Sequence, residues 1–264
     1  AAQGIVMTHT IFNVTNAILF LPLIGFISKL LYKIVPEPRK KEEAHLSFLD
    51  VRMLDTPALG IQQSQKEIIK MSESVGRMMP EFRDLLMEQK REKMADSNLF
   101  DTENELDILQ KDIIEYLSKL MSGTISHEVM DNCRRQLRIS DEYESISDYI
   151  VKILKLNIKI LDSGEKISAE GLNEVVELHD SVTEYLDMIA KAVENDDPNI
   201  LMDARRLGKE ITYLMKDCRN KHLKRVGTGS TTPIKSLMYT DMLNAYRRIK
   251  DHALNVAEVL AGEK

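Results

Sequence analysis

The strongest constraint on the fold is a helical spacing of apolar residues that runs through most of the chain. From residue 57 onward, apolar side chains recur every three or four positions, as in Ile68, Met71, Val75 and Met78, which is the pattern of one face of an α-helix. No segment shows the clear alternation that predicts a strand. Trp is absent and Met is frequent, which favours helices packed with Leu, Ile and Met. We therefore predict an all-α fold.

Helix start signals divide residues 57–264 into six helical segments. The expected starts are capping residues or a proline at the first helical position: Thr56-Pro57, Thr102, Ser126, Ser168, Asp197-Pro198 and the end of the loop 225–233. Long segments with short connections favour antiparallel bundles. A faint repeat relates "YESISDYIVKIL" (143–154) to "YRRIKDHALNVA" (246–257). We expect two related three-helix bundles, with repeats of about 57–164 and 165–264.

The first 35 residues differ from the rest. No charged residue precedes Lys29, and residues 11–28 form an uncharged, mostly apolar run that is long enough to span a bilayer. The basic residues follow this run, which is the wrong order for a signal peptide. We predict one N-terminal transmembrane helix within residues 1–35, in the plasma (inner) membrane of the cell.

The distribution of charge gives this segment a direction. Up to Lys41 there are five basic residues and one acidic residue, so the remainder carries a net charge of about -10 within a total of -6. By the positive-inside rule, the connector 36–56 and the helical domain 57–264 lie in the cytoplasm. Cys133 and Cys218, interpreted as buried reduced thiols, agree with that compartment. An acidic domain is also a poor candidate for binding nucleic acid.

Three polar residues, His9, Asn13 and Asn16, interrupt the apolar segment. Such side chains are costly in lipid unless they face other helices or a cavity. Hydrogen bonding between helices and the lining of a substrate path both remain open as interpretations. Either one requires neighbouring membrane helices, so we expect this chain to be the tail of a larger, multi-pass protein whose upstream helices are its partners.

Two acidic strips are candidates for cation binding. Helical spacing aligns these oxygen-bearing side chains on the third and the sixth segment: Asp141, Glu144 and Asp148, and then Asp251, Asn255 and Glu258. Such donors suit a hard or borderline cation, and an ordinary solvated face with ion pairs is the alternative interpretation.

The remaining patterns argue against catalysis. His127, His179, His222 and His252 are single histidines, which we expect at the surface or at helix ends. No zinc-type Cys/His cluster, phosphate-binding glycine loop or nucleophile–base pair is recognisable in the sequence. We therefore predict that the chain is not an enzyme.

The quoted segments resemble a known family. "HTIFNVTNAILFLP" (9–22) resembles the final membrane segment of bacterial Na/Pi-cotransporter II-related proteins, and "FLDVRMLDTPALGIQQSQKEIIKM" (48–71) resembles the junction that follows it. "ESISDYI" (144–150) and "RRIKDHALNVAEVL" (247–260) are similar to the paired signatures of PhoU-like domains. The resemblance implies the C-terminal portion of a sodium-dependent inorganic phosphate transporter, with a six-helix domain that regulates phosphate uptake.

PhoU-like domains bind metal clusters, so the resemblance also implies a divalent or iron-type metal at five positions: Glu144, Asp148, Asp251, Asn255 and Glu258. The match is incomplete, because Lys152 and Lys155 replace the later Asn and Glu of the first repeat, and Arg247 replaces the first Glu of the second. These cations oppose metal binding by repulsion, and we expect weak binding or none. The family's serine-rich substrate motifs lie outside this chain, so no residue here is predicted to bind phosphate or sodium.

One alternative function stays open. A singly membrane-anchored PhoU-like sensor or scaffold would regulate a partner without transporting anything itself. Membrane segments upstream of Ala1 in the full reading frame would favour the transporter, and their absence would favour the sensor. A homo-oligomer is compatible with both interpretations.

Overall fold

The computed structural model describes residues 7, 12–16, 18–20, 49, 56–229 and 231–263. The chain divides into two units, Ala1–Leu46 and Ser47–Lys264. In the first unit, the described residues 12–16 and 18–20 are helical. A search of the described residues finds no helix that combines the length and the apolar character needed to cross a membrane. Most of the predicted membrane segment and of the connector 36–56 lies outside the described residues.

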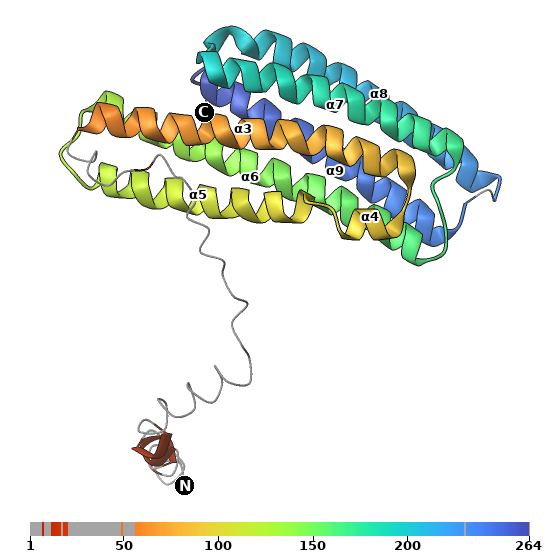
Figure 1. The fold of residues 1–264 in the computed structure, drawn as a ribbon, viewed down its shortest axis with the longest axis horizontal. Helices are drawn as coiled ribbons and strands as arrows, with labels where there is room; N and C mark the ends of the chain where they lie inside the picture. The colour runs from red at the N-terminus through yellow and green to blue at the C-terminus, as the bar shows by residue number, and fades with distance from the viewer. Residues whose placement is uncertain are drawn as a thin grey trace. The chain divides into compact units, whose positions relative to one another are not determined.

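In the second unit, the described residues form helices joined by short connections (Figure 1). This confirms the predicted all-α fold class for that part of the chain. Its elements are α3 (Pro57–Glu88), α4 (Arg91–Ala95), α5 (Leu99–Met121), α6 (His127–Asp162), α7 (Ala169–Asn195), the 3₁₀ turn η3 (Pro198–Ile200), α8 (Leu201–Gly227) and α9 (Pro233–Leu260). The six long helices correspond to the six predicted segments.

Most of the predicted helix starts are confirmed by their caps. The hydroxyls of Ser126 and Ser168 accept hydrogen bonds from backbone N–H groups three residues on, and the Asp197 carboxylate accepts one from the N–H of Asn199. Such bonds satisfy N–H groups that the first helical turn leaves unpaired. Two details were wrong. Thr56 makes no side-chain capping bond, and α5 begins three residues before Thr102, whose hydroxyl donates to the carbonyl of Asn98 instead.

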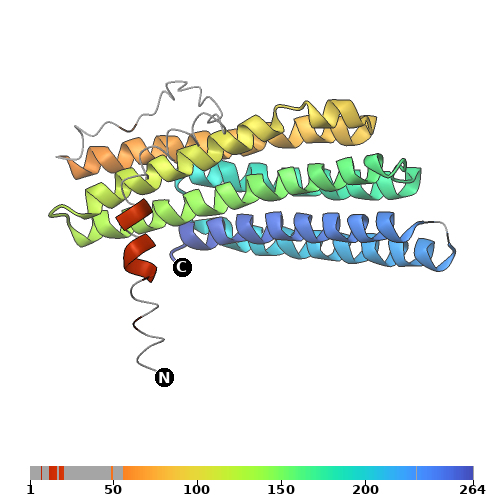
Figure 2. The same ribbon diagram turned by 90° about the horizontal axis from the view of Figure 1, so that it is seen from below.

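The six long helices pack as two groups of three. Helices α3, α5 and α6 all contact one another and form the first bundle, and α7, α8 and α9 form the second. The bundles meet along α6 and α9 and along α3 and α7. Figures 1 and 2 show α6 beside α9 in both views, with α5 and α8 on the outside.

The internal repeat identified in the sequence lies on α6 and α9. Its two tyrosines, Tyr143 and Tyr246, are only 2% and 0% exposed, so both repeats place an aromatic anchor in the core. Burial of each such side chain stabilises the fold by about 2 kcal/mol. The two free cysteines, Cys133 and Cys218, are also buried, as predicted.

Candidate functional site

A carboxyl group from a second helix lies beside the first acidic strip. Glu144 and Asp148 are on α6, and Glu103 of α5 interacts with Asp148. Burial, followed by the hydrogen bond and the charge of Asp148, raises the pKa of Glu103. Burial, followed by the charge of Asp148, raises the pKa of Glu144. Burial is thus the larger cause of both raised pKa values, and the nearby carboxylate of Asp148 adds to it.

The lysines of this repeat are directed toward aromatic rings. The ammonium of Lys152 lies 5.2 Å from the ring centre of Tyr149, and that of Lys155 lies 5.8 Å from the ring centre of Phe100. Both distances are within the range of a cation–π contact. The charge of Lys155 also lowers the pKa of Glu103, although the other influences outweigh it. The two positions at which the family pattern has Asn and Glu therefore contribute positive charge here.

The residues of the second acidic strip, Asp251, Asn255 and Glu258, do not all contact the same partner. Asp251 pairs with the ammonium of Lys250 at 2.5 Å. The amide of Asn255 donates to Glu142 of α6 at 3.1 Å. Glu258 lies near Tyr185, whose pKa is raised by burial first and then by the charges of Asp251 and Glu258. Asn255 thus contacts α6, whereas the charges of Asp251 and Glu258 both act on Tyr185 of α7.

These contacts test whether the residues fit a metal. Within the described part of the chain, no group of three or more His, Cys, Asp or Glu side chains is placed to hold a metal ion. The charge of Lys155 acts on Glu103 beside the first strip, and in the second strip Asp251 pairs with Lys250 while Asn255 donates to Glu142. The described residues therefore do not gather the predicted ligands into one metal-binding group, and no step of the function proposed below passes through a metal.

Of the polar residues predicted in the membrane segment, two are described. Asn13 and Asn16 both lie in a helical segment, Asn13 exposed and Asn16 half-buried. His9 lies outside the described residues.

A polar contact between the bundles was not predicted from the sequence. His252 Nδ1 lies 2.7 Å from Glu142 Oε2, the same oxygen that accepts from Asn255. The His252 ring stacks on Tyr149 with the ring centres 5.6 Å apart. Glu142 and His252 lie 110 residues apart in the chain, so helical spacing could not relate them. Together these residues form a hydrogen-bonded junction between α6 and α9.

His179 is fully buried, and the prediction that it lies at the surface or a helix end was wrong. Its Nε2 lies 3.0 Å from the backbone carbonyl of Met79 on α3, and its Nδ1 lies 3.1 Å from the hydroxyl of Tyr246 on α9. With Nε2 donating and Nδ1 accepting, both nitrogens are satisfied in the neutral ring. Burial lowers the pKa of His179 to about 4. This imidazole therefore connects both bundles in its neutral form.

A second histidine, His222, is also buried, again against prediction, and it lies beside a buried ion pair. Arg225 of α8 donates two hydrogen bonds of 2.7 Å to the carboxylate of Glu174 on α7, and the Tyr239 hydroxyl donates a third. Burial would raise the pKa of Glu174, but the bonds from Arg225 and Tyr239 outweigh it and lower that pKa. The His222 ring stacks on Tyr239, and its Nε2 lies 2.9 Å from the hydroxyl of Ser236. This network fixes one end of the second bundle.

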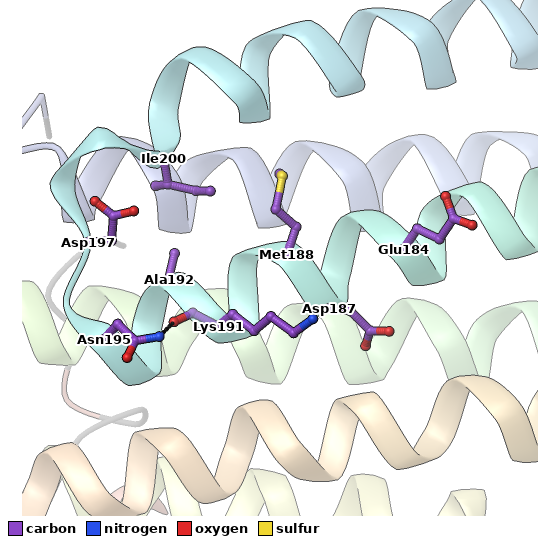
Figure 3. A pocket seen from close by; sticks show the side chains of 8 residues that line it. All are labelled: Glu184, Asp187, Met188, Lys191, Ala192, Asn195, Asp197 and Ile200. Atoms are coloured by element: carbon purple, nitrogen blue, oxygen red, sulfur yellow. Dashed lines mark hydrogen bonds between the residues drawn. The ribbon is translucent and has the colours of Figure 1, made fainter.

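A cavity with a volume of about 450 Å³ lies at the C-terminal end of α7 (Figure 3). Its lining residues come from α7, from η3 and from the turn between them: Glu184, Asp187, Met188, Lys191, Ala192, Asn195, Asp197 and Ile200. The Asn195 amide donates to the backbone carbonyl of Lys191 at 2.8 Å. None of the predicted site residues lies in this lining, so the cavity and the acidic strips are separate features.

The arrangement defines a class of protein: a helical domain built from two repeated three-helix bundles, with polar contacts joining the repeats. The family model of the PhoU domain matches residues 68–156 and 175–260. These two segments cover parts of both bundles. The chain therefore belongs to the PhoU domain family.

The comparisons with individual proteins agree with this assignment. The chain is 21% identical over 259 residues to the "Putative inorganic phosphate export protein YjbB" of Salmonella typhimurium, and 20% identical to the protein of that name in Escherichia coli K12. Each match covers 97% of this chain and 47% of the relative, so the chain spans about half the length of these relatives. The crystal structure of PhoU from Pseudomonas aeruginosa superposes with a TM-score of 0.70 at 15% identity, over 77% of this chain and 96% of that one.

Proposed function

We propose that this chain is the C-terminal portion of a sodium-dependent inorganic phosphate transporter and that its PhoU domain regulates phosphate movement. One observation carries the proposal: a single alignment with proteins named for phosphate export runs through 97% of the chain. It therefore includes most of the apolar N-terminal segment as well as the helical domain. The names of these relatives favour export as the direction, whereas the resemblance to cotransporters favours sodium-coupled uptake.

The proposal places residues 1–35 in the inner membrane beside further helices of the same protein, where Asn13 and Asn16 would meet polar partners. The positive charges between Lys29 and Lys41 support a cytoplasmic position for the connector and the domain. Sodium and phosphate would bind to the membrane part of the whole protein. A homo-oligomer fits this scheme.

Regulation would act through the packing of the two bundles. The Glu142–His252 contact joins α6 to α9, and His179 joins α7 to α3 and α9. A change in these contacts would move α3, the first helix after the connector. Since Pro57 begins α3, such a movement would pull on residues 36–56 and through them on the membrane segment.

We also propose that the domain is not an enzyme and works without a bound metal. Burial raises the pKa of Cys133, and burial followed by nearby carboxylates raises the pKa of Cys218 to about 11. Both thiols are therefore protonated at neutral pH and unsuited to act as nucleophiles.

The test is phosphate flux through the full-length protein. Membrane vesicles carrying the whole protein, or the protein without residues 57–264, would be assayed for radiolabelled phosphate movement in both directions, with and without a sodium gradient. We expect phosphate flux to depend on sodium in both samples. We expect the dependence of this flux on phosphate concentration to differ between the whole protein and the protein that lacks residues 57–264. Unchanged regulation after the deletion would refute the coupling, and sodium-independent flux would refute the cotransport.

A singly anchored sensor remains the second candidate, because the helical domain covers 96% of the PhoU structure from Pseudomonas aeruginosa and so resembles a complete chain by itself. This candidate predicts no phosphate flux in vesicles that contain the full-length protein alone. It also predicts that a separate transporter is retained when the full-length protein is purified from its own membranes.

A further inference from the structure

The outward face of α8 differs in charge from the rest of the molecule. The chain has a net charge of -6, yet α8 contains eight basic and three acidic residues. Its partners are α7, α9 and η3, and Figures 1 and 2 show it on the outside of the second bundle. The side of α8 opposite these contacts is therefore open to solvent.

One line of side chains follows this face from end to end. Spacings of four and three residues align the following positions on one side of the helix: Met202, Arg206, Lys209, Tyr213, Lys216, Asn220 and Leu223. The line runs over 22 residues, from Met202 to Leu223, and is about 32 Å long. All three acidic residues of α8 fall outside it. Two of them, Asp203 and Glu210, pair with Arg206, so the proposal rests on Lys209 and Lys216 for its positive charge.

The line combines cations with large apolar side chains that the fold leaves uncovered. Met202 is 84% exposed, Tyr213 68% and Leu223 59%. Lys216 lies 5.7 Å from the ring centre of Tyr213. Lys and Arg side chains are attracted to an anionic membrane surface, and exposed apolar side chains between them can enter the headgroup region.

We propose that this face of α8 docks on the surface of an anionic lipid bilayer. Charge complementarity favours a surface rich in phosphate headgroups. The spacing of the apolar residues favours lipid over a partner helix, because three residues about three turns apart do not form the continuous apolar seam of a helix–helix interface. This contact between α8 and the bilayer goes beyond the proposed function, and it would hold whether or not the protein transports phosphate.

The experiment uses the absence of Trp from the chain. Tyr213→Trp introduces a single Trp on this line of α8, and Ile108→Trp introduces one on α5, where Ile108 is 41% exposed. Excitation at the red edge of the Trp absorption avoids the tyrosines. Each variant of the whole chain would be reconstituted into vesicles of brominated phosphatidylcholine, alone or mixed equally with brominated phosphatidylglycerol. Bromine quenches Trp only at short range, so quenching reports contact with lipid.

We expect quenching of the Trp at position 213 to be about twofold stronger in the anionic vesicles and to weaken at high salt. The Trp at position 108 should respond equally to both lipids. Adding Lys209→Glu and Lys216→Glu should abolish the increase at position 213, while an unchanged thermal midpoint shows that these exposed changes leave the fold intact. Equal quenching at the two positions, no dependence on lipid charge, or no effect of the charge reversal would overturn the proposal. If the true partner is an acidic protein, the Trp at position 213 should stay unquenched, because these vesicles contain no second protein, and this result would overturn the proposal. If the chain does not transport phosphate, the quenching should be unaffected, so the two proposals can fail separately.

Discussion

The two bundles share one helical layout but distribute charge in opposite ways. Their outer helices occupy the same place in each bundle, yet α5 has six acidic and two basic residues, whereas α8 has three acidic and eight basic residues. In the first bundle, Glu103 and Asp148 crowd together and the pKa of Glu103 is raised. In the second, carboxylates are matched by cations, as in Glu174 with Arg225. The two repeats therefore share one fold while their outer helices carry opposite net charges.

The largest expected effect tests the charge matching of the second bundle. Glu174→Ala leaves the half-buried guanidinium of Arg225 and the hydroxyl of Tyr239 without their shared acceptor. We expect a loss of about 3 kcal/mol in the free energy of unfolding, the lower end for a buried pair, because the Arg225 side chain is 20% exposed and water can partly replace the carboxylate. Urea denaturation followed by circular dichroism measures it. Glu115→Ala in the exposed Glu115–Lys119 pair of α5 is the control, and its midpoint should stay close to that of the original chain. A similar loss in both variants would contradict the contrast between the bundles.

The next effect concerns the contact that joins the bundles. Burial lowers the pKa of His179 to about 4 from an ordinary value of 6.5, so between these pH values the unfolded chain binds a proton that the folded chain does not. The free energy of unfolding should therefore fall by about 3 kcal/mol as the pH drops from 6.5 to 4. His179→Gln cannot titrate, so the difference in stability between the two proteins should shrink over this range. A difference that is independent of pH would show that His179 does not stay neutral.

Equivalent aspartates of the two repeats should respond with opposite signs. Asp251→Asn removes the partner of Lys250, whose side chain is only 12% exposed, and should cost about 1 kcal/mol. Asp148→Asn removes a charge that raises the pKa of both Glu103 and Glu144, and should stabilise the fold by roughly 0.5 kcal/mol at neutral pH. Because raised carboxyl pKa values destabilise only while the groups are ionised, the gain should disappear as the pH falls through those pKa values. Chemical denaturation at neutral and acidic pH measures the free energy of unfolding of both variants. If both variants were stabilised, or both destabilised, the expected difference between the two repeats would be contradicted.

The smallest expected effect is that of added metal. Since Lys155 acts beside the first strip and Lys250 pairs with Asp251 in the second, we expect manganese, iron or zinc to leave the thermal midpoint of the purified whole chain unchanged, whereas a tightly bound ion would raise it by mass action. Elemental analysis of the protein gives an independent measure. Stoichiometric metal that disappears in Glu144→Ala or Asp251→Ala would contradict this expectation.

The sequence by itself determined the helices and their grouping. Helical spacing and capping residues are local properties, so Ser126, Ser168 and Asp197 could be identified as helix starts without knowledge of the fold. The internal repeat likewise identified Tyr143 and Tyr246 as equivalent positions, and both proved to be buried. The acidic strips were also local, because they follow from spacing on single helices.

Only the tertiary structure decided what each polar residue contacts. Glu103 joins Asp148 because α5 packs on α6, and Asn255 meets Glu142 because the two bundles join along α6 and α9. Single histidines likewise have no periodicity that distinguishes a surface position from the centre of the molecule, so the burial of His179 between α3 and α9 could not be predicted. Helix formation depends on neighbours within a few residues, whereas hydrogen bonds and ion pairs between helices depend on packing across about a hundred residues of chain, as in the Glu142–His252 contact.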